Sequence, residues 1–231
     1  MITLSHLVNN IRTIASSAGN SDDFKASDEL IIHWCNQVRS MLISQSIEKR
    51  NDILDIWIQN ISCLELELVD SAECCEVETN CFILRSVKEL PVTVETSSRN
   101  MIIGVYTLDN QSLDELSVQK ARYSKYTKYS SKRTGWYIKN NRLYIVNNIL
   151  LERVTIAGIW DDPTELANYI SCDNQACWSI DSNYPVTLKM AEVIVDIIVK
   201  TKCQVMMNFP LDNSNNASGS IPQQAQQSKI E

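Results

Sequence analysis

Apolar residues recur at helical spacing in the first part of the chain. The earliest stretch runs from Leu4 to Ala15, and Gly19 is expected to follow its last turn. A second stretch begins after Ser27, which suits the N-cap, with Asp28 in the favoured acidic first turn. The spacing therefore predicts two amphipathic helices. Residues 51–61 fit either a third short helix or an extended lead-in to the next element.

The period changes to two in the middle of the chain. Leu64, Leu66 and Leu68 alternate with glutamates, which predicts a half-buried strand. Asn140-Asn141 separates two apolar runs and, because Asn tolerates positive φ, predicts a tight hairpin. Further strands are predicted over residues 81–87, 91–95, 101–108, 136–139, 142–146 and 154–160.

Helical signals return after the last predicted strand. Asp162 is a suitable cap and Pro163 suits a first helical position, so a short helix should begin there. A longer apolar stripe follows Tyr184-Pro185. Residues 208–231 are rich in Asn, Ser and Gln and too polar to fold alone.

This order of elements favours an α+β fold. We expect N-terminal helices over residues 1–61, an antiparallel β-rich core over 62–160, and a C-terminal helical region over 161–207. An extended or disordered C-terminal arm is expected over 208–231.

Charge and composition narrow the functional classes. The formal net charge is −7, which argues against a dedicated nucleic-acid binder. Residues 1–20 are amphipathic and resemble neither a signal peptide nor a membrane span. We therefore expect a protein that stays in a cytoplasm and has no membrane partner. Its eight cysteines should be mostly reduced.

Only the cysteines are numerous enough to be considered as the ligands of a metal site. They form two loose groups, Cys63, Cys74, Cys75 and Cys81 in one and Cys172 and Cys177 in the other. Neither group has the C-x-x-C spacing of a zinc knuckle. We expect buried or loop thiols and no bound metal, and zinc is the less favoured alternative.

The sequence signals for a catalytic site are weak. His6 and His33 fall on predicted helices and suit structural roles. Five glycines leave little material for a phosphate loop. Asp161-Asp162 could serve a hydrolase, but capping explains Asp162 better. We expect no catalytic site and no cofactor.

One segment concentrates basic charge among aromatic residues. It is a candidate interface, either for an acidic protein neighbour or, as the alternative function, for nucleic acid. Charge balance favours the protein interface. The residues are Lys120, Arg122, Tyr123, Lys125, Tyr126, Lys128, Tyr129, Lys132 and Arg133.

Several short segments, taken in order, resemble the head-to-tail connector proteins of crAss-like tailed bacteriophages. They are Gln37-Val38-Arg39-Ser40-Met41-Leu42, Trp57-Ile58-Gln59 before Cys63-Leu64-Glu65-Leu66, Ile83-Leu84-Arg85-Ser86 with Leu90-Pro91, Gly135-Trp136-Tyr137 before Leu143-Tyr144-Ile145, Ile156-Ala157-Gly158-Ile159-Trp160-Asp161-Asp162-Pro163, Tyr184-Pro185, and Asp212-Asn213 with Asn215-Asn216.

The resemblance implies a virion protein without a reaction, made in the bacterial host cytoplasm. It implies a ring of twelve copies that lies between portal and tail in the neck. Such a ring binds the portal and downstream neck or tail proteins and extends a conduit through which genomic DNA passes without specific binding. A C-terminal segment that embraces the portal would include Leu188, Ile194, Ile198, Phe209, Asp212, Asn213, Asn215 and Asn216.

Overall fold

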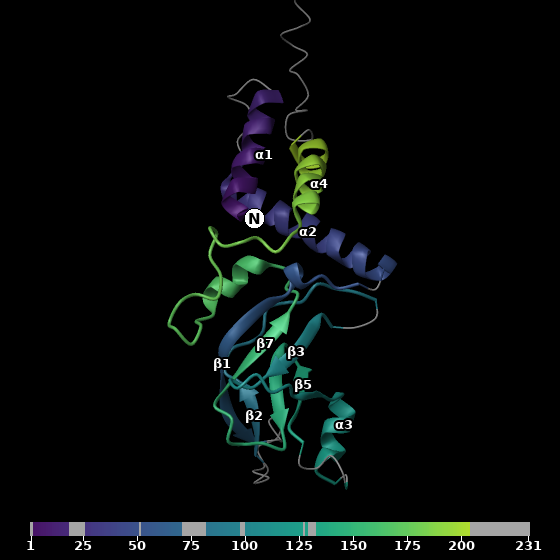
Figure 1. The fold of residues 1–231 in the computed structure, drawn as a ribbon, viewed down its shortest axis with the longest axis vertical. Coiled ribbons are helices and arrows are strands. Elements are labelled where there is room, and N and C mark those ends of the chain that lie inside the picture. The colour runs from purple at the N-terminus through teal and green to yellow at the C-terminus, as the bar shows by residue number, and fades with distance from the viewer. Residues whose placement is uncertain are drawn as a thin grey trace, which may run out of the picture.

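The computed structural model divides the chain into a helical end and a β end (Figure 1). It describes residues 2–18, 26–50, 52–70, 82–97, 100–126, 128 and 133–203. Helices α1, α2 and α4 lie together at one end of the long axis, and the sheet fills the other end. The α+β fold class is confirmed, with helices and a sheet of seven strands.

The helical end is built from three helices. They are α1 (Leu4–Ala18), α2 (Asp28–Arg50) and α4 (Leu188–Ile198), and a π-helical turn, η4 (Val199–Cys203), extends α4. Their apolar stripes face one another, and Leu4, Ile11, Ile31, Ile194 and Ile198 are fully buried. Ser27 caps α2 as expected, since its hydroxyl accepts a hydrogen bond from the Leu30 amide at 3.3 Å. None of the helices in the described ranges is long and apolar enough to cross a bilayer.

The β end is a single mixed sheet with the strand order β3-β7-β1-β2-β6-β5-β4. Every strand pair is antiparallel except β4 with β5, so the expectation of a purely antiparallel core is corrected at that edge. The strands are β1 (Gln59–Asp70), β2 (Phe82–Ser86), β3 (Ile102–Tyr106), β4 (Asp114–Glu115), β5 (Gly135–Lys139), β6 (Arg142–Val146) and β7 (Arg153–Gly158).

A short connection curls this sheet back on itself. Ser112 bridges Tyr106 of β3, and the Leu113 amide donates to the Val105 carbonyl at 2.9 Å. The next two residues form β4 and pair with β5 at the opposite edge. Residues 112–115 therefore join both edges and pair some of the backbone groups that open edges would expose, among them the Val105 carbonyl.

The inside of the curled sheet is the apolar core of the β end. Alternate residues from its strands are buried there, as the period of two requires. They include Leu64, Leu84, Val105, Leu113, Trp136, Ile145, Val154 and Ile156. Trp136 also donates its indole N–H to the Leu113 carbonyl at 3.2 Å, which anchors the connection that closes the sheet.

Most predicted elements are present, and one is not. The hairpin at Asn140-Asn141 is confirmed, with φ of 51° and 55° at the two residues. Residues 91–95 do not form a strand, because they meet β7's exit only through an isolated bridge between Thr93 and Trp160. Residues 51–61 hold both proposed structures in part, a 3₁₀ turn, η1 (Asp55–Trp57), and then the start of β1 at Gln59.

Three short helical segments complete the described chain. They are α3 (Val118–Tyr123), η2 (Ser124–Tyr126) and η3 (Pro163–Asn168). The predicted helix start at Asp162 is confirmed, since its carboxylate accepts from the Thr164 amide at 2.8 Å. That helix is a 3₁₀ helix of six residues.

Candidate functional site

The described residues of the basic segment (residues 120–133) lie on the flank of the β end. Helix α3 begins after Ser117, whose hydroxyl accepts from the Lys120 amide at 3.2 Å. Ala121 packs inward, whereas Lys120 and Arg122 are exposed. Tyr123 and Tyr126 are 68% and 85% exposed, so two aromatic rings stand in solvent beside the charges. The structure thus brings the first half of the predicted interface together on one surface.

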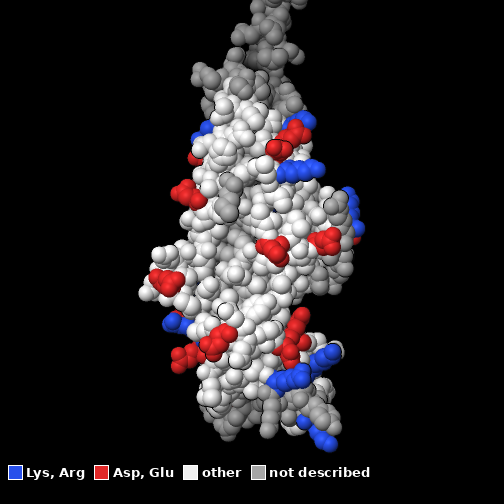
Figure 2. Space-filling model, viewed as in Figure 1, with Lys and Arg blue, Asp and Glu red and all other residues white. Residues whose placement is uncertain are grey.

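The second half of the segment is only partly described. Lys128 is exposed, and Arg133 lies 3.8 Å from the Asp114 carboxylate of β4. Asn147 donates its side-chain N–H to the Arg133 carbonyl at 3.1 Å, which ties the segment to the end of β6. Tyr129, Lys132 and the side chain of Lys125 fall outside the described residues. Figure 2 shows Lys and Arg side chains gathered over the region of α3.

An apolar surface lies at the far tip of the β end. The pairing of β1 with β2 extends to this tip, where Leu68 pairs with Leu84 and Asp70 with Phe82. Leu68 and Phe82 are each about half exposed. The Leu66 amide donates to the Glu152 carbonyl at 2.9 Å, so the connection that carries exposed Ile149 and Leu150 runs alongside. Apolar side chains gathered in this way are typical of contact surfaces.

A buried polar junction joins the helical end to the β end. Arg39 of α2 is fully buried and donates from Nη1 to the Trp160 carbonyl at 2.8 Å and from Nε to the Pro185 carbonyl at 3.2 Å. Asn36 donates to the Asp162 carboxylate at 2.8 Å and accepts from the Tyr184 hydroxyl at 2.7 Å. One face of α2 therefore holds the exit of β7 and the lead-in to α4 in fixed positions.

The electrostatics of this junction are those of a desolvated cation. Burial lowers the pKa of the Arg39 guanidinium, while Tyr184, Asp161 and Asp162 favour its charged form. Burial likewise raises the pKa of the Tyr184 hydroxyl far above its usual range. Nη2 of Arg39 is buried without a hydrogen-bond partner in the described part of the chain. The junction is a structural clamp whose polar groups are almost fully paired.

The predicted portal-contact residues of α4 divide into two groups. Leu188 is 65% exposed at the start of the helix, whereas Ile194 and Ile198 are buried in the core. The last two hold α4 in place and present no free surface. Phe209, Asp212, Asn213, Asn215 and Asn216 lie outside the described residues.

Two apolar grooves flank α4. The larger, about 430 Å³, lies between α1 and α4 and is lined by Leu7, Ile14 and Leu188 among others. The second, about 390 Å³, lies between the end of α2 and α4, with Trp57 and Val193 in its lining. Leu188 in the first groove and Val193 in the second are therefore exposed apolar residues of this surface.

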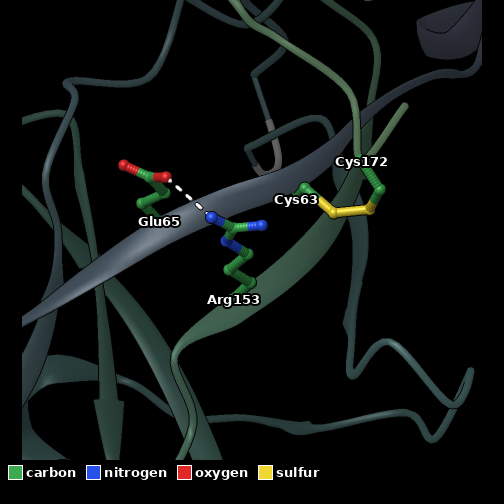
Figure 3. Close-up of a disulfide and its surroundings, with 4 residues drawn as sticks. All are labelled: Cys63, Glu65, Arg153 and Cys172. Atoms are coloured by element: carbon green, nitrogen blue, oxygen red, sulfur yellow. Dashed lines mark hydrogen bonds and ion pairs between the residues drawn. A yellow bond between two sulfur atoms is a disulfide. The ribbon is translucent and has the colours of Figure 1, made fainter. Parts of the chain in front are cut away.

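Cys63 and Cys172 form a disulfide, which corrects the expectation of thiols at these two positions (Figure 3). Their Cα atoms are 5.3 Å apart although 109 positions separate them in the sequence. Cys63 lies at a bulge of β1, and Cys172 lies in the connection between η3 and α4. Cys35, Cys177 and Cys203 are free thiols, whereas Cys74, Cys75 and Cys81 lie outside the described residues.

The candidate acidic pair at the end of β7 has structural partners. The Asp162 carboxylate accepts from Asn36 and from the amide and hydroxyl of Thr164. The Asp161 amide and carbonyl pair with Val92 and Ser40. Within the described ranges, no group of three or more His, Cys, Asp and Glu residues is placed to hold a metal ion.

Sequence reasoning missed the two linkages that connect distant parts of the chain. The sequence carries no signal for the disulfide, because Cys63 and Cys172 belong to the two different groups of cysteines described above. Arg39 was visible as the lone basic residue within the apolar stripe of α2, a position where an unpaired charge is costly. That conflict predicts a buried polar partner, which the carbonyls of Trp160 and Pro185 supply.

Comparison with known families places the chain among phage structural proteins. The family model of phage tail ring protein 2, a ring protein of crAss-like phages, matches residues 6–227. No curated protein matches the chain. The family match confirms the resemblance to a crAss-like phage ring protein and gives the protein a place in the virion, while its position in the neck stays a prediction. Because the match spans nearly the whole sequence, the chain belongs to the phage tail ring protein 2 family.

Proposed function

We propose that this protein forms a ring in the phage neck, between portal and tail, that extends the DNA conduit and binds proteins on both sides. The observation that carries the proposal is the exposed basic side chains of Lys120, Arg122, Lys128 and Arg133 on an otherwise acidic subunit. Six of the 21 Lys and Arg residues and none of the 28 acidic residues fall within positions 120–133, so the other positions carry a formal charge of −13.

A ring built from identical subunits needs two different, complementary surfaces on each copy. The basic segment supplies one such surface, and the acidic remainder of a neighbouring copy supplies the other. Exposed tyrosines and arginines suit this role, since both are enriched at the centres of protein interfaces. We assign Lys120, Arg122, Tyr123 and Tyr126 to the contact between neighbouring subunits.

The elongated shape suggests how the two ends are used (Figure 1). Helix α4 and Cys203, the last residue that the structure describes, lie at the helical end, so we assign that end to the portal. Leu188 and residues 209–216 are the proposed contacts there. The apolar tip with Leu68, Phe82, Ile149 and Leu150 lies at the opposite end, and we assign it to proteins on the tail side.

A DNA conduit requires a lumen that a polyanion does not grip. Phosphate contacts dominate DNA affinity, so a wall poor in basic groups lets DNA slide. A net charge of −7 on each copy, repeated in a ring of twelve, satisfies this requirement when the basic segments are covered between subunits.

Charge reversal tests the subunit contact. We expect Lys120→Glu with Arg122→Glu to convert rings to monomers, measured by light scattering after gel filtration and by negative-stain microscopy. Lys139→Glu, at an exposed basic residue at the end of β5, is the control and should leave rings intact. Rings that survive the double reversal would refute the assignment of this surface.

Truncation tests the portal contact separately. Removal of residues 209–231 should abolish co-purification with the portal protein and leave the fold unchanged by circular dichroism. Full portal binding by the truncated chain would show that the arm is not the contact.

The alternative function is a nucleic-acid-binding module that uses the same segment. The exposed rings of Tyr123 and Tyr126 beside basic side chains favour it, because bases stack on aromatic groups. A persistent monomer that binds single-stranded DNA with a steep salt dependence would support this reading. Rings with weak DNA binding would support the neck protein.

A further inference from the structure

The Cys63–Cys172 pair lies where a small redox reagent can reach it. We propose that this pair is an oxidative modification site, open as two thiols in the producing cell and closed by exchange with a low-molecular-weight disulfide of the glutathione class. The proposal rests on the virion location that the family gives and not on the portal contact.

Hydrogen bonds other than the disulfide hold the connection that carries Cys172 against the residues that follow β2. Lys88 donates from Nζ to the Asn168 carbonyl at 2.8 Å, and the Tyr169 hydroxyl donates to the Glu89 carbonyl. The Cys177 amide donates to the Tyr169 carbonyl at 2.8 Å and closes the loop on itself. Cys172 is therefore held near β1 while both sulfurs are still thiols.

The backbone of β1 turns Cys63 toward that connection. Its φ is 55°, a left-handed conformation that a non-glycine residue adopts at a cost. The pairing of β1 with β7 shifts register between Ile61 and Leu64, so Cys63 sits at a bulge. Bulges redirect side chains, and this one places the two Cα atoms 5.3 Å apart, within the usual range for a disulfide.

The two sulfurs differ in their access to solvent. Cys63 is 8% exposed, whereas Cys172 is an exposed residue. A cavity of about 180 Å³ opens beside the bond, lined by Cys63, Lys88, Arg153 and Ser171 among others. Figure 3 shows Arg153 alongside the disulfide, paired with Glu65 at 3.1 Å. Lys88 and Arg153 carry the charge opposite to the carboxylates of glutathione.

This asymmetry sets the order of the exchange steps. The exposed Cys172 thiolate attacks one sulfur of oxidised glutathione, forms a mixed disulfide and releases one glutathione thiolate. The sheltered Cys63, as its thiolate, then attacks the Cys172 sulfur, forms the protein disulfide and releases the second glutathione thiolate. Two protein thiols are oxidised and one glutathione disulfide is reduced to two thiols, with two protons passing to solvent or the leaving thiolates.

The move from the reducing cytosol to the outside of the cell determines when the disulfide forms. Disulfides are rare in a reducing cytosol and persist on virions outside cells. A pair that closes only on leaving the cell would stay open during subunit assembly. It would then fix the connection before α4 to β1 in the finished particle.

Alkylation after acid quenching tests the timing. In producing bacterial cells, both Cys63 and Cys172 should be alkylated by iodoacetamide, whereas peptides from purified particles should be linked by the disulfide. A linked pair in the quenched cells, or alkylated thiols in purified particles, would overturn the proposal. This experiment does not measure ring formation. If the proposed ring function were wrong, the state of the two cysteines could still be interpreted.

Single variants test the order of steps on purified protein incubated with oxidised glutathione. Cys63→Ser should accumulate one glutathione on Cys172, and Cys172→Ser should carry roughly tenfold less on Cys63 because that sulfur is sheltered. Cys177→Ser is the matched control and should still form the linked pair. Equal adducts on Cys63 and Cys172, or no adduct on Cys172, would contradict the proposed route.

Discussion

Arg39 shows how a single residue couples the two ends of the molecule. A buried guanidinium usually faces a carboxylate, but the hydrogen bonds of Arg39 go to the Trp160 and Pro185 carbonyls. Asp161 and Asp162 favour the charged form of the Arg39 guanidinium only through the electrostatic field of their carboxylates. Its role is therefore to satisfy backbone oxygens that would otherwise be buried without a donor.

Replacement of Arg39 tests this role. Arg39→Met keeps much of the volume but leaves two carbonyls unsatisfied, so we expect a loss of about 2–5 kcal/mol in the free energy of unfolding. Urea denaturation followed by tryptophan fluorescence measures it. Arg12→Met, which breaks an exposed ion pair with Asp28, is the control and should cost less than about 1 kcal/mol. Equal losses in the two variants would refute the clamp.

Tyr169 makes stability depend on alkaline pH. Burial, followed by Glu165 and Glu89, raises its pKa from 10.0 to about 12. Because the folded chain holds the proton more tightly, this contribution is complete below pH 10 and is lost as pH rises through 12. Tyr169→Phe should therefore show a shallower fall in unfolding free energy over that window. Comparison with pH 7 removes the constant effect of the lost hydrogen bond, and identical slopes would contradict the assignment.

Residue-level prediction worked where the interaction is local. Ser27 and Asp162 were predicted as caps because a cap bonds amides two or three positions away, and both do so. Cys63 and Cys172 could not be matched, because only the folded sheet brings positions 109 apart together.

At the scale of elements, local turn chemistry and long-range pairing had different outcomes. The Asn140-Asn141 hairpin was predictable, since two residues with positive φ match the twist of the flanking strands. Residues 91–95 are apolar enough for a strand, yet they contact the exit of β7 through one bridge. Val92 is half exposed there, so apolar character alone did not distinguish a strand from an extended edge segment.

The hairpin turn offers a direct test of backbone conformation. Asn141 has φ of 55°, which alanine adopts at a cost of about 1 kcal/mol and glycine adopts freely. Asn141→Ala should lower the free energy of unfolding by that amount, and Asn141→Gly should change it by only a few tenths of that amount. Chemical denaturation measures both variants. If alanine were tolerated as well as glycine, the left-handed turn would be wrong.

At the scale of the whole molecule, the subunit is long, with different chemistry at its two ends and on its flank. The helical end carries the grooves beside α4, and the far tip carries exposed apolar side chains. The flank near α3 is basic (Figure 2). The α+β class followed from the order of periodic segments, but the curling of the sheet through residues 112–115 did not. A two-residue strand leaves no periodicity to read.

Salt dependence should distinguish the forces that hold the proposed ring together. Charge pairing between the basic segment and an acidic neighbour weakens as the Debye length falls from about 10 Å at 0.1 M salt to about 3 Å at 1 M. The wild-type ring should therefore dissociate over this range, as followed by light scattering at fixed protein concentration. An apolar contact would instead persist or strengthen, since burial of apolar surface is not screened. A ring that is unchanged at 1 M salt would move the subunit contact from residues 120–133 to the apolar tip or the grooves beside α4.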